Sequence, residues 1–194
     1  MSALPFLLLA LSACQGSSSN EKPAPVRDAI ELRDAKGNVD ARLTAGRPCR
    51  ATIEADEMIV GGSPLVMMLG DVRWSGEDID GSTVIARDGT TYARIYPALP
   101  SETEVALFDL EGVALIRIDV TGDVATVRDS AQTILRELRR TGAAITIPLP
   151  GGNATVTGTT DLLLASLLSA TEVSPEMRAL AACHRLLPSQ KAAI

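Results

Sequence analysis

The sequence predicts an α+β fold. Antiparallel strands form a β-rich meander, arranged as a sandwich or a partly open barrel, with about three helices toward the C-terminus. From Ile30 onward, short apolar segments alternate with turns that contain Gly and Asp, which is typical of antiparallel strands. After about residue 128, apolar residues recur at the helical spacing. The 194 residues provide one domain with a sizeable core.

Four segments are predicted along the chain: a signal peptide over residues 1–13, a flexible tether over 14–26, a single domain over 27–188 and a loose tail over 189–194. The leader is apolar from Leu4 to Ala13. This is the length of a signal-peptide core and is shorter than the roughly 20 residues of a membrane-spanning helix. The tether is rich in Ser, Asn and Pro, so it cannot bury enough apolar surface to fold.

The apolar leader ends in Leu11-Ser12-Ala13-Cys14. This tetrapeptide resembles the lipobox of bacterial lipoproteins, although Met1-Ser2-Ala3 lacks the basic residue that such leaders carry. The resemblance implies cleavage before Cys14, a diacylglycerol on its sulfur and a location in the cell envelope. The resemblance extends to Gln15, and it implies sorting to the outer membrane rather than the inner one. An ordinary secretory signal and a buried apolar strand remain alternatives.

Lipidation of Cys14 would leave two cysteines, Cys49 and Cys183. A disulfide persists in the oxidising compartment to which an exported domain is sent. We therefore predict a bridge from Cys49 to Cys183 that closes a loop over most of the domain. The alternative is a pair of buried thiols that act as small hydrophobic groups.

A repeated pattern predicts three β-hairpins: an extended arm, an Asp, a Gly one or three residues later, and a second arm that ends in Arg and an aliphatic residue. The two-residue turn Asp88-Gly89 and the longer Asp-to-Gly spacings suit known hairpin turns. The three copies are Ile30–Leu43, Val84–Ile95 and Val105–Ile118.

The arginines of the repeat, Arg42, Arg94 and Arg117, occupy the same place in each copy and face away from the apolar side. They are either solvated residues that discourage edge pairing or a basic row that binds an anionic partner. Further apolar arms lie between the first two copies, and another hairpin follows the third around Gly122-Asp123.

Three helices are predicted in the last third of the chain. The first begins at Asp129 or Ser130 and runs to about Arg140, after which a hairpin spans residues 143–157. The second runs from Leu162 to Ala170, and its excess of leucines favours a buried position over a docking face. The third begins at Ser174-Pro175, with Cys183 on its inner face.

Residues with chemical potential are few. His184 is the only histidine and is predicted to be exposed, because it points about 100° away from Cys183 on a helix. Asp78 and Asp80 resemble the start of a calcium loop, but Gly89 stands where the bidentate Glu belongs, so a solvated acidic turn is the alternative. Trp74 is predicted to be a core anchor, with a ligand platform as the alternative.

Composition narrows the function classes. A net charge of −6 and an aromatic content of 3% argue against nucleic acid as a partner. No cofactor is expected. The sequence favours a non-enzymatic envelope protein, held to the membrane by its lipid, that binds or scaffolds an envelope protein. The alternatives are a small envelope hydrolase that uses acidic residues, and a ligand or inhibitor module with its pocket between sheet and helices.

Overall fold

The computed structural model describes residues 29–99 and 101–187. The predictions for the signal peptide, Cys14, the tether and the loose tail lie outside these residues. Within them the chain forms fourteen antiparallel strands followed by two helices. The strands are β1 (Ala29–Arg33), β2 (Val39–Thr44), β3 (Cys49–Ile53), β4 (Asp56–Gly61), β5 (Leu65–Leu69), β6 (Val72–Ile79), β7 (Ser82–Arg87), β8 (Thr90–Tyr96), β9 (Glu104–Phe108), β10 (Ala114–Thr121), β11 (Val124–Arg128), β12 (Ile134–Thr141), β13 (Ala144–Leu149) and β14 (Gly152–Thr157).

The strands form a closed barrel, in which each strand pairs with its neighbours in sequence and β1 pairs with β14. The closing register places Leu32 of β1 opposite Val156 of β14. The predicted β-rich antiparallel architecture is confirmed, but the expectation of a sandwich or partly open barrel is wrong. Closure pairs both edges of the sheet, which removes the unpaired backbone groups that an open edge would expose.

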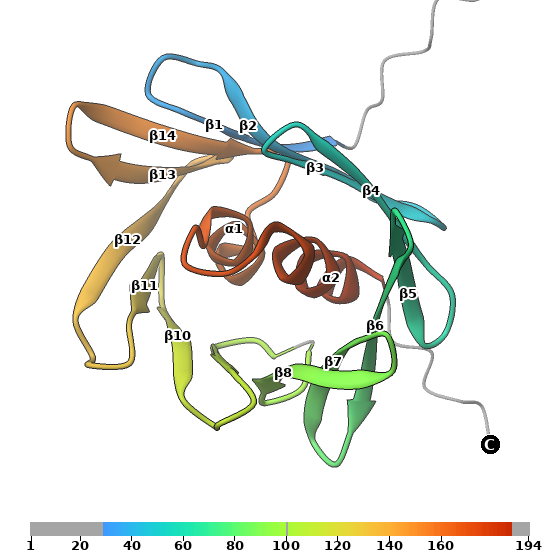
Figure 1. Ribbon diagram of the computed structural model, residues 1–194. Helices are drawn as coiled ribbons and strands as arrows, with labels where there is room; N and C mark the ends of the chain where they lie inside the picture. The colour runs from blue at the N-terminus through green and yellow to red at the C-terminus, as the bar shows by residue number, and fades with distance from the viewer. Residues whose placement is uncertain (1–28, 100, 188–194) are drawn as a thin grey trace, which may run out of the picture.

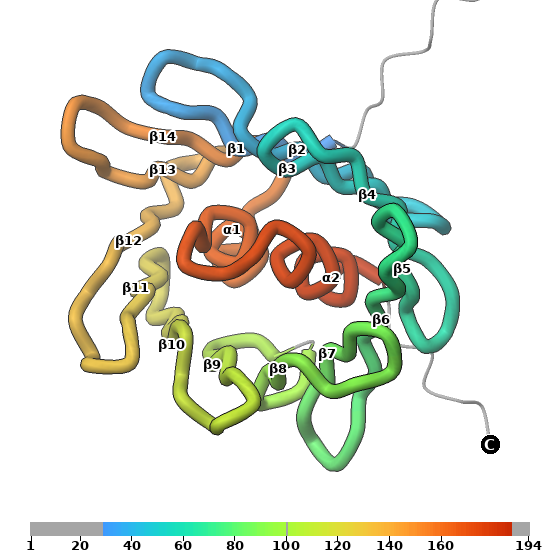
Figure 2. Tube along the Cα trace, viewed as in Figure 1, coloured from blue at the N-terminus to red at the C-terminus, as the bar shows by residue number. Residues whose placement is uncertain are grey.

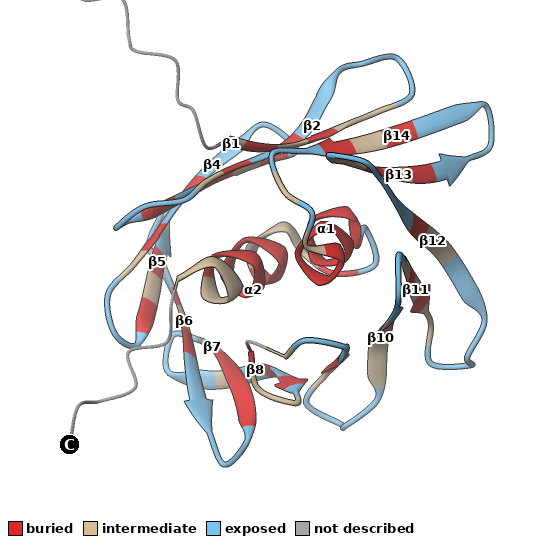
Figure 3. Ribbon diagram, turned by 180° about the vertical axis from the view of Figure 1, so that it is seen from behind, coloured by how far each residue is buried: buried red, intermediate tan, exposed pale blue. Residues whose placement is uncertain are grey.

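Helices α1 (Leu162–Ser169) and α2 (Pro175–Leu186) lie inside the ring of strands (Figures 1 and 2). Helix α1 contacts β10, β11, β12 and β1, whereas α2 contacts β3, β4, β5 and β6. All eight residues of α1 are buried, as the red ribbon in Figure 3 shows. The leucine-rich segment is therefore core, and the inward side chains of the barrel wall form one hydrophobic cluster with both helices.

The predicted starts of the second and third helices are confirmed. Asp161 caps α1 by accepting a hydrogen bond from the Leu164 amide at 3.1 Å. Ser174 caps α2 through the Met177 amide at 3.4 Å, and Pro175 occupies the first helical position. These caps satisfy amides that have no partner within the helix.

The helix predicted from Asp129 or Ser130 to Arg140 is wrong, because this segment contains strand β12. Leu138 points into the barrel opposite Ala125, and β12 pairs with β11 and β13 on its two sides. A stripe of apolar residues at helical spacing was compatible with either structure, and the two neighbouring strands decide for the sheet.

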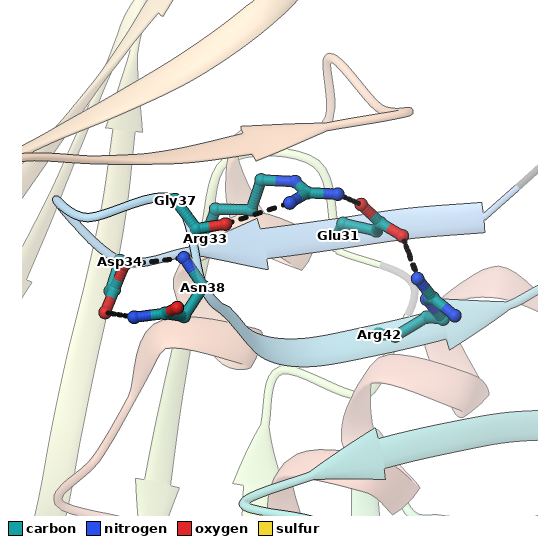
Figure 4. A network of polar contacts seen from close by, with 6 residues as sticks. All are labelled: Glu31, Arg33, Asp34, Gly37, Asn38 and Arg42. Atoms are coloured by element: carbon teal, nitrogen blue, oxygen red, sulfur yellow. Dashed lines mark hydrogen bonds and ion pairs between the residues drawn. The ribbon is translucent and has the colours of Figure 1, made fainter.

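The predicted hairpins are confirmed as β1–β2, β7–β8 and β9–β10. In the first, an oxygen of Asp34 accepts a hydrogen bond from the Asn38 amide at 2.8 Å (Figure 4). The same oxygen accepts a hydrogen bond from the Lys36 amide at 2.8 Å. Asp109 binds the Val113 amide at 2.8 Å in the same way. The acidic residue thus stabilises the turn that the glycine makes possible.

Candidate functional site

A cavity of about 830 Å³ lies at one end of the barrel, between the C-terminal part of α2 and the wall formed by β3 to β6. The residues around it come from the turns before β3 and β5, from β6 and from the end of α2. They include Pro48, the segment 61–65, the segment 76–78, His184 and Leu187. Cavities of this size accommodate small organic molecules.

Two glycines, Gly61 and Gly76, form part of the cavity wall. A Cβ at Gly61 would lie 3.3 Å from Cβ of Pro48. A Cβ at Gly76 of β6 would lie 3.9 Å from Cδ2 of His184, which is an ordinary contact distance, so the imidazole ring lies next to Gly76. A side chain larger than that of alanine at position 76 would extend toward the His184 ring.

His184 is nearly buried, with 12% of its side chain exposed. The prediction of an exposed helix residue is wrong, because α2 lies inside the barrel and its other faces also meet protein. The Nε2 atom of His184 lies 3.3 Å from Oδ1 of Asp78. The Thr83 hydroxyl donates to the same oxygen at 2.6 Å and accepts a hydrogen bond from the Leu99 amide at 3.0 Å. Asp78 is thereby oriented toward the histidine.

Burial lowers the pKa of His184 below its ordinary value, and the Asp78 carboxylate only opposes this shift. The imidazole is therefore neutral near pH 7 and carries one proton. Because Nε2 faces the carboxylate, we assign the proton to Nε2, which leaves a lone pair on Nδ1. Nδ1 is buried and has no hydrogen-bond partner among residues 29–99 and 101–187. A buried polar atom without a partner costs stability, and this atom has almost no surface open to the cavity.

The arrangement differs from that of a nucleophilic hydrolase, in which the base contacts a hydroxyl or thiol. Within the described part of the chain, the polar contact of the His184 ring is with Asp78. The neighbouring Cys183 is in a disulfide. The hydrolase alternative stays a prediction.

The predicted disulfide is present and joins Cys49 of β3 to Cys183 of α2, with 5.9 Å between the Cα atoms. Both cysteines are fully buried. The bridge ties the helix to the barrel wall one residue before His184.

The two acidic residues considered as metal ligands, Asp78 and Asp80, do not lie together with a third metal-ligating side chain among the described residues. Asp78 lines the cavity, whereas Asp80 lies in the β6–β7 turn with φ of 49°. Across the residues that the structure describes, no group of three or more His, Cys, Asp or Glu side chains is placed to hold a metal ion.

The three repeat arginines do not form one row, because they lie on β2, β8 and β10. Arg42 donates to Glu31 of β1 at 2.9 Å (Figure 4). Arg117 lies 5.8 Å from the centre of the Phe108 ring, and Arg94 is directly opposite Phe108 in the β8–β9 register. All three are exposed, as predicted; Arg94 and Arg117 lie on the two sides of Phe108, and Arg42 lies elsewhere on the barrel.

Trp74 is a core residue, as predicted, with 4% of its surface exposed. Its ring meets Tyr92 edge-on at 5.0 Å, and the Arg87 guanidinium lies 5.7 Å from its centre. Sequence reasoning missed the pairing of His184 with Asp78, which lie 106 positions apart. Asp78 lies near the end of β6 and His184 near the end of α2, next to Cys183, and no local pattern in the sequence links the two.

Together these features define a β-barrel whose interior is filled by two helices and whose end carries a polar-lined cavity. Comparison with protein-family models, with curated proteins and with solved structures found no match to this chain. Neither described helix is long and apolar enough to cross a membrane.

Proposed function

We propose that the protein is a lipid-anchored, non-enzymatic binding protein of the bacterial cell envelope, and that the cavity beside His184 is its ligand site. The observation that carries the proposal is the cavity itself, which is open to solvent and brings the Asp78 carboxylate together with the apolar side chains of Pro48 and Leu65. The lumen around α1 is packed with buried side chains, which favours the barrel end over the interior as the place of binding.

Two features support the envelope location. The lipobox-like segment ending at Cys14 provides an anchor, since attached acyl chains hold a protein at a bilayer. The buried Cys49–Cys183 bridge fits an oxidising compartment. The outer membrane is the expected side because Gln15 follows the cysteine.

The proposal is tested in bacteria that produce the full chain with a photo-crosslinking residue in place of Ser63 at the cavity. We expect the wild-type chain to incorporate fatty acid and to fractionate with the outer membrane, and Cys14→Ser to lose both properties. On irradiation, an adduct should form at position 63. It should be lost in Gly76→Val, which fills the cavity, and kept in Ser75→Val, which alters the other face of β6.

Recovery of an unlipidated chain that starts at Met1 in the cytosol would contradict the anchor. An adduct that survives Gly76→Val as well as Ser75→Val would contradict the cavity as the binding site. A crosslinker at Met68, which is exposed on the outer face of β5, reports contacts that do not depend on the cavity.

A further inference from the structure

We infer that a groove on the outer face of strand β8 binds a carbohydrate, so that the protein holds neutral sugar units of a glycan at a second site. This groove lies on the outside of the barrel, apart from the cavity beside His184, and it adds a binding function to the one proposed above.

The groove has a volume of about 620 Å³ and lies on β8 between the β6–β7 turn and the β9–β10 turn. Its lining includes Arg94 and Tyr96 of β8, Phe108 of β9 and the turn segment 109–112. Arg94 and Tyr96 are exposed and alternate along β8 with buried residues, so they belong to the outer face of the barrel.

Two aromatic rings line this groove, although aromatic residues make up only 3% of the chain. Tyr96 is 59% exposed, and Phe108 is half-buried directly opposite Arg94 in the β8–β9 register. Tyr96 is opposite Ala106, two residues before Phe108, so the two rings are diagonal neighbours on the sheet surface. Exposed rings of this kind provide flat apolar surfaces, against which the C–H face of a sugar ring can pack.

The polar side chains around the rings supply both hydrogen-bond donors and acceptors. The Arg94 guanidinium offers several N–H donors, and it forms no ion pair with a carboxylate of the described residues. The carboxylates of Asp80 and Glu111 are acceptors, and the Thr91 hydroxyl can act in either role. Each hydroxyl group of a sugar also donates and accepts, so this lining is complementary to a carbohydrate.

The charges of the lining disfavour a strongly charged ligand. Arg94 repels a cation, whereas the carboxylates of Asp80, Asp109 and Glu111 repel an anion. One oxygen of Asp109 is also engaged by the Val113 amide at 2.8 Å. A neutral ligand with many hydroxyl groups avoids both repulsions.

The position of β8 within the barrel disfavours an extended peptide as the ligand. Strand β8 pairs with β7 along one edge and with β9 along the other. Its backbone therefore cannot accept an additional strand, which is the usual way in which a sheet binds a peptide. A ligand at the groove is held by side chains, which suits a ring with several hydroxyl groups.

The test uses the purified full-length protein labelled with 3-fluorotyrosine and observed by ¹⁹F NMR. The chain has two tyrosines, and Tyr96→Phe identifies the resonance that belongs to the groove. Tyr92 is the internal control, because its ring packs edge-on against Trp74 at 5.0 Å and lies outside the lining of the groove.

The probes are cellotetraose, maltotetraose and chitotetraose, with benzoate and benzylammonium as charged aromatic comparisons. We expect at least one tetrasaccharide to shift the Tyr96 resonance in a saturable manner and to leave the Tyr92 resonance in place.

We expect Phe108→Leu, which removes the ring and keeps an apolar side chain, to weaken binding of that tetrasaccharide about fivefold. Arg94→Gln should weaken it about tenfold through loss of a charge-assisted hydrogen bond. The matched control is Arg50→Gln, because Arg50 is 55% exposed on β3, elsewhere on the barrel. This control should change the affinity less than about twofold. An unchanged Tyr92 resonance reports that each variant keeps its fold.

The absence of a saturable Tyr96 shift with all three tetrasaccharides at up to about 10 mM would overturn the inference. Equal weakening by Arg94→Gln and Arg50→Gln would overturn it as well. Binding of benzoate or benzylammonium as tight as that of the best tetrasaccharide would overturn the carbohydrate class. None of these results alters the proposed site beside His184, which the crosslink at position 63 tests separately.

Discussion

At the scale of single residues, three hairpin turns have the same hydrogen bond to an Asp side chain but differ in the residue at their fourth position. Asp34, Asp109 and Asp129 each accept a hydrogen bond from the amide four residues ahead at 2.8 Å. The fourth position of the turn is left-handed in all three, with φ of 87° at Gly37, 79° at Gly112 and 65° at Gln132. A residue with a side chain is strained in this conformation, whereas glycine is not.

We therefore expect Gln132→Gly to raise the free energy of unfolding by about 0.5–1 kcal/mol, since relief of strain exceeds the added entropy of the unfolded chain. Chemical denaturation measures the change. The reciprocal substitution Gly112→Gln should lower the free energy of unfolding by a similar or larger amount. A loss of stability in Gln132→Gly would show that the Gln132 side chain makes a compensating contact.

At the scale of elements, the C-terminal end of α1 is held by two arginines from different parts of the chain. Arg178 of α2 is 3% exposed, and its Nε donates to the Leu168 carbonyl at 3.1 Å while another nitrogen binds Glu54 at 2.8 Å. Burial lowers the pKa of Arg178, and contact with Glu54 opposes the shift. Arg136 of β12 donates to the Ser169 carbonyl and pairs with Glu172. Both cations complement the negative end of the α1 dipole.

Replacing Arg178 by Met should lower the free energy of unfolding by about 2–4 kcal/mol, because it leaves the buried Leu168 carbonyl without its donor. Denaturant titration of the variant measures this loss. The matched control is Arg139→Met, which removes an exposed pair with Glu137 and should change stability by less than about 1 kcal/mol. Similar effects of the two substitutions would contradict a special role for the buried arginine.

At the scale of the whole molecule, the helices and the barrel form one body because several links join them. The core cluster includes the inward faces of the strands and both helices. Arg178 and Arg136 connect the two helices to the barrel wall at one end of the barrel. The disulfide connects α2 to β3 nearer the other end. The cavity beside His184 thus has a wall and a helix that are held at a defined distance.

Replacing Cys49 and Cys183 together by Ala should lower the free energy of unfolding by about 5 kcal/mol in the chain-entropy model, because the bridge spans 134 positions. The midpoint of denaturant unfolding, compared with that of the wild type, measures the loss. Reductant added during unfolding should shift the wild type toward the variant and leave the variant unchanged. Coincident curves without reductant would contradict a stabilising bridge.

Much of the local structure could be predicted from the sequence. Local patterns of a few residues predict the hairpin turns at Asp34 and Asp109 and the helix starts at Asp161 and Ser174. The burial of Trp74 follows from its residue type. The disulfide followed from the number of cysteines left by the predicted anchor. The strand at 134–141 could not be predicted, because Gln132 occupies the turn position at which the other hairpins carry glycine, so the sequence lacks the hairpin pattern there.

The sequence by itself determined the hairpins, the helix caps and the pairing of Cys49 with Cys183. The hairpins and caps depend on residues within about five positions of one another, and the disulfide depends on the number of cysteines that the predicted anchor leaves. Only the tertiary structure decided that β1 closes on β14, that α1 and α2 enter the barrel, and that His184 meets Asp78. The physical reason is that these contacts join residues about a hundred positions apart, whose free energy depends on the space that all fourteen strands enclose together.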